Sequence, residues 1–538
     1  MIRISNLSVP IDDKSSMKEL AAGRLSIAPG EIRQVLVVHK AIDARRYHGA
    51  PIRFVYMLDV AVEKGEKKIL NRLRKDKDIR LSQAYHQERL PVHKAAIGEL
   101  PPVVAGFGPA GMFAALTLAR HGLNPIVVER GRDVDRRHAD IDRFWHTGEF
   151  DEKSNVQFGE GGAGTFSDGK LTTRVNDPLM GQVLDDFISA GAPAEIKYLH
   201  KPHIGTDMLR QVVKNIRLEI IRLGGRVRFE TKVTGLETDA EGKILAVELN
   251  GEERLPARAL FMGIGHSARD TYRMLWEKGV AMEAKPFAIG VRIEHPQEFV
   301  DKAQYGPDAA NPVLPVADYA LTYNDKAKGR GAYSFCMCPG GQVVAAASEY
   351  GGVVTNGMSN YQRDSKVANS AILVTVHTAD FADHVLGGIE FQRQWEHLAY
   401  ELGGCNYHAP VQTVGDFLSG SSGSEDFLVP PGYLPGTRTA DLHKCLPGFV
   451  TDMIEAALPY WDRKIPGFAH RGAVMTGVET RSSAPCRIIR NRQSYESVST
   501  LGLYPIGEGA GYAGGIMSAA LDGMNSTMAF LRSAYPDL

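Results

Sequence analysis

Three glycines spaced as G-x-G-x-x-G, Gly106, Gly108 and Gly111, constrain this chain more than any other feature. They follow the apolar run 103–105 and precede a segment with helical periodicity. In a strand–turn–helix unit the first glycine allows a tight turn. The second lets the backbone approach a pyrophosphate, and the third lets the helix pack on the strand. The helix then directs its N-terminal N–H groups at the phosphates. The segment therefore predicts a Rossmann-like dinucleotide-binding unit.

An acidic residue, Glu129, follows the second predicted strand, PIVVE. A carboxylate at this place accepts hydrogen bonds from a ribose 2′-hydroxyl and favours an adenosine without a 2′-phosphate. A glycine triplet alone is a weak signal, but here strand, helix, second strand and acid occur in order. We expect the following residues to bind the cofactor: Gly106, Gly108, Pro109, Ala110, Gly111, Glu129 and Arg130.

A second strand–glycine–helix pattern lies near the C-terminus, in LYPIGEGAGYAGGIMSAALDGM at 503–524. A helix that begins here would direct N–H groups at the negative charge of a reduced flavin, and Glu508 is placed to bind a ribityl hydroxyl. A nicotinamide dehydrogenase needs no such element, so FAD is the predicted cofactor. The residues expected to contact it are Gly507, Glu508, Gly514, Gly515 and Ile516. GIGHSA at 263–268 lacks the third glycine, so a separate NAD(P)H domain is not expected, but Gly265 is included as a cofactor contact.

The glycine-rich stretch FGEGGAGTFSDGKL at 158–171 imitates a phosphate-binding P-loop. The P-loop needs Ser or Thr after its lysine to hold Mg²⁺, and Leu171 occupies that position, so an ATPase is not predicted. We interpret the stretch as a loop that lies against the cofactor. Its expected contacts are Gly161, Gly162, Gly164 and Lys170. Cys405-x-x-His408 and His443-x-Cys445 do not have the spacing of a structural zinc site, and no metal is predicted.

Several of these motifs together resemble a known group of flavoproteins. Seven segments are similar to the bacterial FAD-dependent dehydrogenases or oxidoreductases with a glutathione-reductase-type FAD domain. They are the fingerprint segment, ALFMGIGHSARDT, IGEGAGYAGGI, FGEGGAGTFSDGKL, PHIGTD, YSFCMCPGG and GVETRSSAP. The resemblance covers nearly the whole chain. It implies the fold and FAD, and it names no substrate.

The expected fold class is α/β, with a Rossmann-like FAD-binding domain that is discontinuous in sequence. A mostly β substrate domain interrupts it, and a small α+β domain precedes it, with Ser15 or Ser16 placed to cap its first helix. A double proline at 101–102 makes a natural boundary. The predicted divisions are 1–98 (N-terminal), 99–270 (FAD-binding, first part), 271–470 (substrate or cap) and 471–538 (FAD-binding, C-terminal part).

Composition excludes some classes of function. The formal net charge is −1, which gives no overall electrostatic case for binding nucleic acid, although basic residues outnumber acidic ones in 1–100. Five unpatterned cysteines, no signal-peptide pattern and no long apolar run predict a cytoplasmic protein without a membrane span. A small-molecule substrate is expected. The sequence leaves the oligomeric state, the substrate and the electron donor open, with NAD(P)H as a candidate transient donor.

Four residues are candidates for chemistry. Cys336 and Cys338 stand two apart in a predicted strand, which would place them side by side, with Cα atoms about 6.5–7 Å apart, at the upper edge of disulfide geometry. We expect reduced thiols that shape a pocket near the flavin, with a redox role as the alternative. Arg481 and Arg487 could clamp an acidic substrate or offset the charge of reduced flavin, or could be structural.

The sequence thus predicts a FAD-dependent oxidoreductase that passes hydride between a substrate carbon and flavin N5. A flavoprotein monooxygenase is one alternative, because the same fold supports it. A non-enzymatic flavin-binding protein with a basic N-terminal interaction domain is the other.

Overall fold

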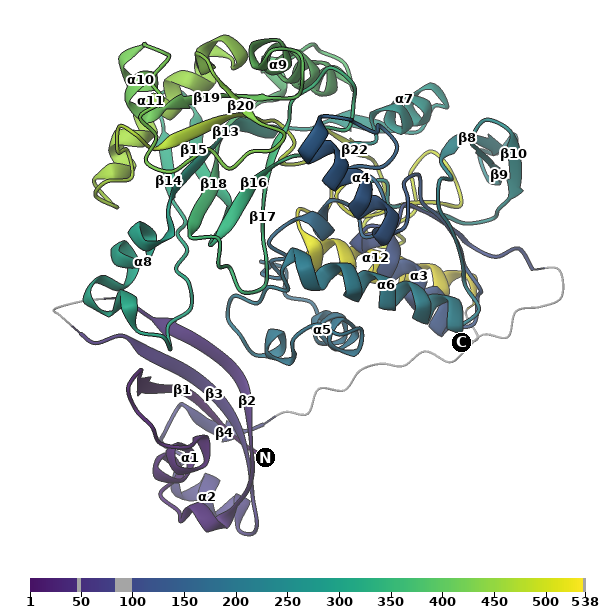
Figure 1. Ribbon diagram of the computed structural model, residues 1–538. Coiled ribbons are helices and arrows are strands. Elements are labelled where there is room, and N and C mark those ends of the chain that lie inside the picture. The colour runs from purple at the N-terminus through teal and green to yellow at the C-terminus, as the bar shows by residue number, and fades with distance from the viewer. Residues whose placement is uncertain (46–49, 83–98, 536–538) are drawn as a thin grey trace.

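The computed structural model describes residues 1–45, 50–82 and 99–535, and the elements gather in three regions (Figure 1). A parallel sheet with the strand order β23-β11-β5-β6-β7 is the centre of the nucleotide-binding region. The strand that comes last in the chain pairs with β11, and β11 pairs with the strand that leads into the glycine fingerprint. The strands are β5 (Val103–Ala105), β6 (Ile126–Val128), β7 (Arg226–Arg228), β11 (Leu260–Met262) and β23 (Leu503–Pro505).

Both faces of this sheet are covered. Val103 and Ala105 belong to one buried cluster and Val104 to another, because successive side chains of a strand point to opposite faces. An uninterrupted apolar strand is what such a sheet requires. On the Val104 side lie α3 (Pro109–Arg120), α5 (Met180–Ser189), α6 (Thr206–Arg222) and α12 (Ile516–Ala534). On the other side lie β8 (Val233–Thr238), β9 (Ile244–Leu249), β10 (Glu253–Pro256) and α7 (Arg269–Glu277). Helix α4 (Val134–Thr147) follows β6.

The second region is a sheet with the order β14-β15-β18-β13-β21-β19-β20, antiparallel except between its last two strands. Helices α9 and α11 pack with it around Trp461, which is fully buried. Its strands are β13 (Phe287–Pro296), β14 (Thr322–Asp325), β15 (Arg330–Cys338), β18 (Val367–Val376), β19 (Ala409–Thr413), β20 (Thr437–Thr439) and β21 (Val474–Glu479). The other elements are β12 (Met282–Ala284), β16 (Gly341–Ala345), β17 (Thr355–Ser359), β22 (Cys486–Ile488), α8 (Gln297–Tyr305), α9 (Gly387–Gly403), α10 (Val414–Ser419) and α11 (Gly448–Asp462).

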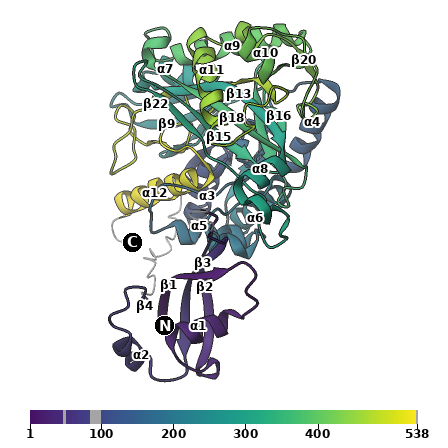
Figure 2. The same ribbon diagram turned by 90° about the vertical axis from the view of Figure 1, so that its left-hand side faces the viewer.

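The N-terminal region is an antiparallel sheet of order β2-β3-β1-β4 with two short helices, at one end of the molecule (Figures 1 and 2). Ser16 caps its first helix and forms a reciprocal capping box with Glu19. The backbone of Lys40 bonds to residues 198 and 200, which joins this region to the rest of the chain. The elements are β1 (Ile2–Pro10), α1 (Met17–Leu25), β2 (Ile32–Asp43), β3 (Arg53–Val62), α2 (Glu66–Arg72) and β4 (Ile79–Leu81).

The predicted α/β class with a Rossmann-like unit is confirmed. The four domain divisions stay a prediction. The first boundary, at residue 98, falls on the segment 83–98, which lies outside the described residues. Within the described ranges, no helix combines the length and the apolar character needed to cross a bilayer.

Candidate functional site

A cavity of about 380 Å³ runs from the fingerprint turn to residues of β15, β17 and the end of β21. Most of the residues expected at the cofactor line it: Gly106, Gly108, Pro109, Ala110, Glu129, Arg130, Gly162, Gly164, Lys170, Gly265, Glu508, Gly514, Gly515 and Ile516. Cys336 and Arg481 line the same cavity. Five other predicted residues are not among its lining: Gly111, Gly161, Cys338, Arg487 and Gly507.

The fingerprint glycines divide into packing positions and an open position. Gly106 has φ +90°, and a Cβ added to it would lie 2.3 Å from the Gly263 carbonyl oxygen. A Cβ on Gly111 would lie 2.0 Å from the Gly106 carbonyl oxygen. By contrast, a Cβ on Gly108 would meet nothing nearer than 3.8 Å, and this glycine faces the cavity. Gly106 and Gly111 therefore close the turn, while Gly108 leaves room for a ligand to approach the backbone.

The loop 161–164 fits between the two glycine–helix units. A Cβ on Gly162 would lie 3.0 Å from the Gly108 Cα, and one on Gly164 would lie 3.1 Å from the Ile516 side chain. Gly161 packs inward instead, against Thr165. The loop thus touches both the fingerprint turn and the start of α12, which accounts for the absence of side chains at these positions.

The start of α12 provides the second open wall. A Cβ on Gly514 would have no heavy atom within 4 Å, and the same is true of Gly265 at the opposite wall. Gly507 packs against the Ala110 methyl group, where an added Cβ would lie 2.6 Å away. The residues present therefore fit FAD. Open backbone at two helix N-termini can receive phosphates and a flavin edge, because each N-terminus carries unpaired N–H groups and a partial positive charge.

Glu129 has a structural task that the sequence did not indicate. Its buried carboxylate accepts N–H bonds from Phe107 at 2.8 Å, Gly131 at 2.9 Å and Gly159 at 3.0 Å. Through these hydrogen bonds the Glu129 carboxylate links the fingerprint turn to the loop after β6 and to the segment before Gly161. A carboxylate has about four acceptor sites, so capacity remains for the ribose hydroxyl predicted above.

Arg130, the neighbouring residue that is also predicted to bind the cofactor, is fixed by contacts with other side chains of the protein. Its guanidinium makes a bidentate pair with Asp270 and lies 4.2 Å from the centroid of the Phe158 ring. Phe158 lines the cavity as well. The arginine is therefore fixed in place at the cavity wall before any ligand binds.

Two carboxyl groups lie on the cavity wall, the buried Glu479 on β21 and the partly buried Glu508 after β23. Burial raises the pKa of each to about 7, and in Glu479 the Arg292 guanidinium, 3.2 Å away, opposes that rise. Carboxyl groups poised near neutral pH can hold or release a proton during a reaction.

Cys336 lies on the cavity wall at an irregular point of β15. Phe335 pairs with Ala371 and Cys338 with Asn369, so Cys336 and Met337 together oppose the single residue between those partners. Cys336 also has φ +45°. The strand therefore has a β-bulge here, and the regular spacing expected for the two cysteines does not apply.

Of the two predicted arginines, only Arg481 reaches the cavity. Its guanidinium is buried and bonds to Glu396 at 3.0 and 2.8 Å, and also to Ser348. Arg269 pairs with the same Glu396. Arg487 is outside the cavity lining and pairs with Glu283 at 2.7 Å.

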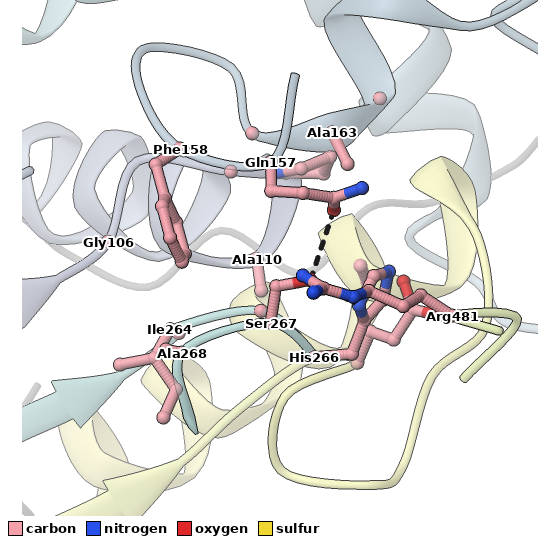
Figure 3. A pocket seen from close by; sticks show the side chains of 18 of the residues that line it. Gly106, Ala110, Gln157, Phe158, Ala163, Ile264, His266, Ser267, Ala268 and Arg481 are labelled. Atoms are coloured by element: carbon pink, nitrogen blue, oxygen red, sulfur yellow. Dashed lines mark hydrogen bonds between the residues drawn. The ribbon is translucent and has the colours of Figure 1, made fainter. Parts of the chain in front are cut away.

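Sequence reasoning missed a polar group on the far wall (Figure 3). The Ser267 hydroxyl donates to Gln157 Oε1 at 3.3 Å and lies 2.9 Å from His266 Nδ1. Burial, together with Arg481 and Arg269, lowers the pKa of His266 to about 3, so the imidazole is neutral. GIGHSA contains the signal, but the prediction uses its glycines alone, as an incomplete fingerprint with Gly265 as a cofactor contact, and not its His266 and Ser267.

We expect Gly108→Ala to weaken FAD binding without unfolding the protein. The added methyl group meets no protein atom closer than 3.8 Å, so it projects into the space that FAD needs. The dissociation constant should rise at least about tenfold, or about 1.4 kcal/mol, as measured by flavin retention and fluorescence. Gly181→Ala, at a helix position with nothing within 4 Å and outside the cavity lining, is the matched control. Equal FAD affinity in both variants would contradict this assignment.

The contribution of Glu508 to stability should fall as pH rises toward neutrality. The pKa of Glu508 is about 7 in the folded chain and about 4.3 in an unfolded one. Between these values the folded state holds a proton that the unfolded state lacks, so the contribution of Glu508 to the free energy of unfolding is largest below pH about 4 and is lost as pH rises to about 7. Urea unfolding of Glu508→Gln at several pH values should show a flatter dependence than wild type. Glu277→Gln, at an exposed position of α7, should leave the wild-type slope intact.

Comparison with known proteins agrees with this site. Residues 286–482 match a family model described as FAD-dependent protein, C-terminal domain-like, and residues 1–61 match a domain of unknown function, DUF8436. An uncharacterized protein of Clostridium beijerinckii is 50% identical over 527 residues, 97% of each chain.

Two solved structures align with most of this chain at low identity and low TM-score. CtdE in complex with FAD is 12% identical, with 80% of this chain and 84% of that chain covered and a TM-score of 0.32. L-Proline dehydrogenase from P. horikoshii is 10% identical, with 82% and 95% covered and a TM-score of 0.37. On the family match and the full-length relative, the chain belongs to the same family as the Clostridium beijerinckii protein and is a FAD-dependent protein.

Proposed function

We propose that the protein is a FAD-dependent oxidoreductase that holds FAD along the cavity and transfers hydride between a small-molecule substrate and flavin N5. One observation carries the proposal. A single cavity is lined at one end by the fingerprint glycines and at the other by Phe335, Cys336, Glu479 and Arg481 from the antiparallel region. The first set suits a dinucleotide, and the second suits a substrate that must meet the redox end of it.

The two ends of the cavity have different tasks. The N–H groups of the turn at Gly108 and the N-terminus of α12 favour negative charge, which suits the pyrophosphate and the reduced flavin respectively. FAD, when bound, supplies a two-electron acceptor and donor. The protein orients it, excludes water and stabilises its charge.

The two acids of the cavity wall, Glu479 and Glu508, can exchange protons during the reaction. Glu479 and Glu508 have pKa values near 7, so each can hold a proton at its carboxyl oxygen or release it at neutral pH. His266 is neutral because its pKa is about 3, so it can donate or accept one hydrogen bond but carries no charge. A substrate that gains or loses a proton with the hydride would meet these groups.

The reductant is tested directly by anaerobic mixing of the holoprotein with NADH, NADPH and a panel of metabolites. Bleaching of the flavin absorption band by one of them identifies the donor. A protein whose FAD is bound and reducible by dithionite, yet inert to every hydride donor and to oxidised acceptors after reduction, would refute the oxidoreductase assignment. Hydroxylated product that forms only with oxygen present would favour the monooxygenase alternative.

The arginines provide a paired test of the substrate end. Arg481→Met should slow flavin reduction at least about tenfold, because it removes a buried positive charge from the cavity wall, and the loss of a charge-assisted hydrogen bond has about this effect. Glu396 keeps its pair with Arg269 in this variant, so its carboxylate is not left without a charged partner. Arg487→Met lies off the cavity and should match wild type in stopped-flow traces. Unchanged kinetics in Arg481→Met would remove the residue from the site.

A further inference from the structure

The bulge at Cys336 places a cysteine where the backbone favours glycine. A φ of +45° is uncommon for a residue with a Cβ, and a bulge of this kind usually has glycine at its left-handed position. Such conformations are energetically unfavourable and gather at functional sites. The thiol is therefore held at the cavity wall at a conformational cost that glycine would not incur.

Two cationic side chains, Arg292 and Lys170, bind the backbone of the bulge and lie near both thiols. Arg292, which is fully buried, donates to the Cys336 carbonyl at 2.8 Å. Lys170 donates to the Met337 carbonyl and lies 3.2 Å from Asp168. Both side chains also lie within electrostatic range of the two sulfur atoms. Positive charge beside a thiol favours the thiolate, which is the reactive form.

The two thiols differ in character. Cys336 faces the cavity, while Cys338 is fully buried behind it and donates to the Cys336 carbonyl at 3.2 Å. The Cys338 thiol, acting as a hydrogen-bond donor, and then Lys170 and Arg292 lower the pKa of Cys336. The pKa of Cys338 is raised. An accessible low-pKa thiol with a buried high-pKa neighbour is the arrangement of a nucleophilic and a resolving cysteine.

We propose that Cys336 and Cys338 are a redox-active dithiol that exchanges two electrons with the FAD in the cavity. The inference rests on the FAD placement proposed above. In the forward direction the Cys336 thiolate and the Cys338 thiol form one S–S bond, and the S–H bond of Cys338 breaks. The two electrons and that proton pass to oxidised FAD and give its reduced anionic form. The eleven-atom ring that results is small, so the disulfide is of the strained, easily reduced class.

Acidic groups oppose the cations around this pair and set its pH dependence. Those that face it from the neighbouring elements are Asp168, Glu479 and Glu508. Tyr319 lies within range of Cys338. The Cys338 hydrogen bond, with Lys170 and Arg292, outweighs burial and these acidic groups, so the pKa of Cys336 is lowered.

The wild-type holoprotein gives the first test. Anaerobic dithionite titration of the oxidised protein should consume four electrons per FAD, two for the flavin and two for the disulfide. Trypsin digestion after alkylation without reductant isolates 331–363, which contains Cys336 and Cys338 and no other cysteine. Mass spectrometry should show this peptide two hydrogens lighter and unalkylated before titration, and doubly alkylated after it.

Two glycine variants give the matched comparison. Cys336→Gly suits the left-handed backbone, so it should fold at least as stably as wild type, bind FAD and take up only two electrons. Cys405→Gly is the control, because Cys405 also has positive φ, +60°, but is exposed and outside the cavity lining. It should keep the four-electron uptake.

Two further results would overturn the proposal. One is an oxidised wild-type holoprotein that takes up two electrons and yields the doubly alkylated peptide. The other is four-electron uptake that persists in Cys336→Gly. The flavin absorption of the same samples shows whether FAD is bound. Failure of the dithiol proposal leaves this absorption present, whereas failure of the FAD assignment would appear as protein without bound flavin. In that case the protein can be equilibrated with glutathione, and the alkylation state of peptide 331–363 still shows whether Cys336 and Cys338 form a disulfide. This measurement does not depend on any activity.

Discussion

The close packing of α12 on α3 is the contact on which the site depends. A Cβ on Gly523 would lie 2.1 Å from the Ala110 carbonyl oxygen, so only glycine lets the two helices approach this closely. The parallel pairing of β23 with β11 brings the C-terminal segment beside the fingerprint strand, and the helix contact then fixes its direction. Both helix N-termini consequently open on one cavity. Without this contact the two glycine motifs would be separate turns.

A buried charge cluster joins the two halves of the cavity. Arg269 on α7, in the nucleotide-binding region, and Arg481 after β21 share Glu396 on α9. All three are nearly inaccessible to solvent. Buried ion pairs add little net stability, but removal of one partner typically costs about 3–5 kcal/mol because a charge is left uncompensated. The cluster therefore fixes the relative position of the regions, and with it the distance between the cofactor end and the substrate end.

Sequence reasoning succeeded where the signal was local. The fingerprint turn, the Ser16 cap and the glycine start of α12 depend on residues within a few positions of one another, so spacing alone predicts them. It failed where a partner is distant. The three N–H donors to Glu129 include Gly159, whose approach depends on the path of the chain after α4. The bulge at Cys336 is a shift in the pairing of β15 with β18. The residues of β15 alone do not predict it.

The position of the bulge also explains why the intervening residue is apolar. Met337 belongs to a buried cluster with Ile52 of the N-terminal region and Tyr305 of α8, whereas Cys336 faces the cavity. The carbonyl groups of Cys336 and Met337 accept bonds from Arg292 and Lys170. Hydrophobic burial thus holds the bulge from one side and charge-assisted hydrogen bonds hold it from the other. A left-handed cysteine persists only where its surroundings determine it in this way. The N-terminal region, which is remote from β15 in sequence, therefore helps to position the thiol at the cavity wall.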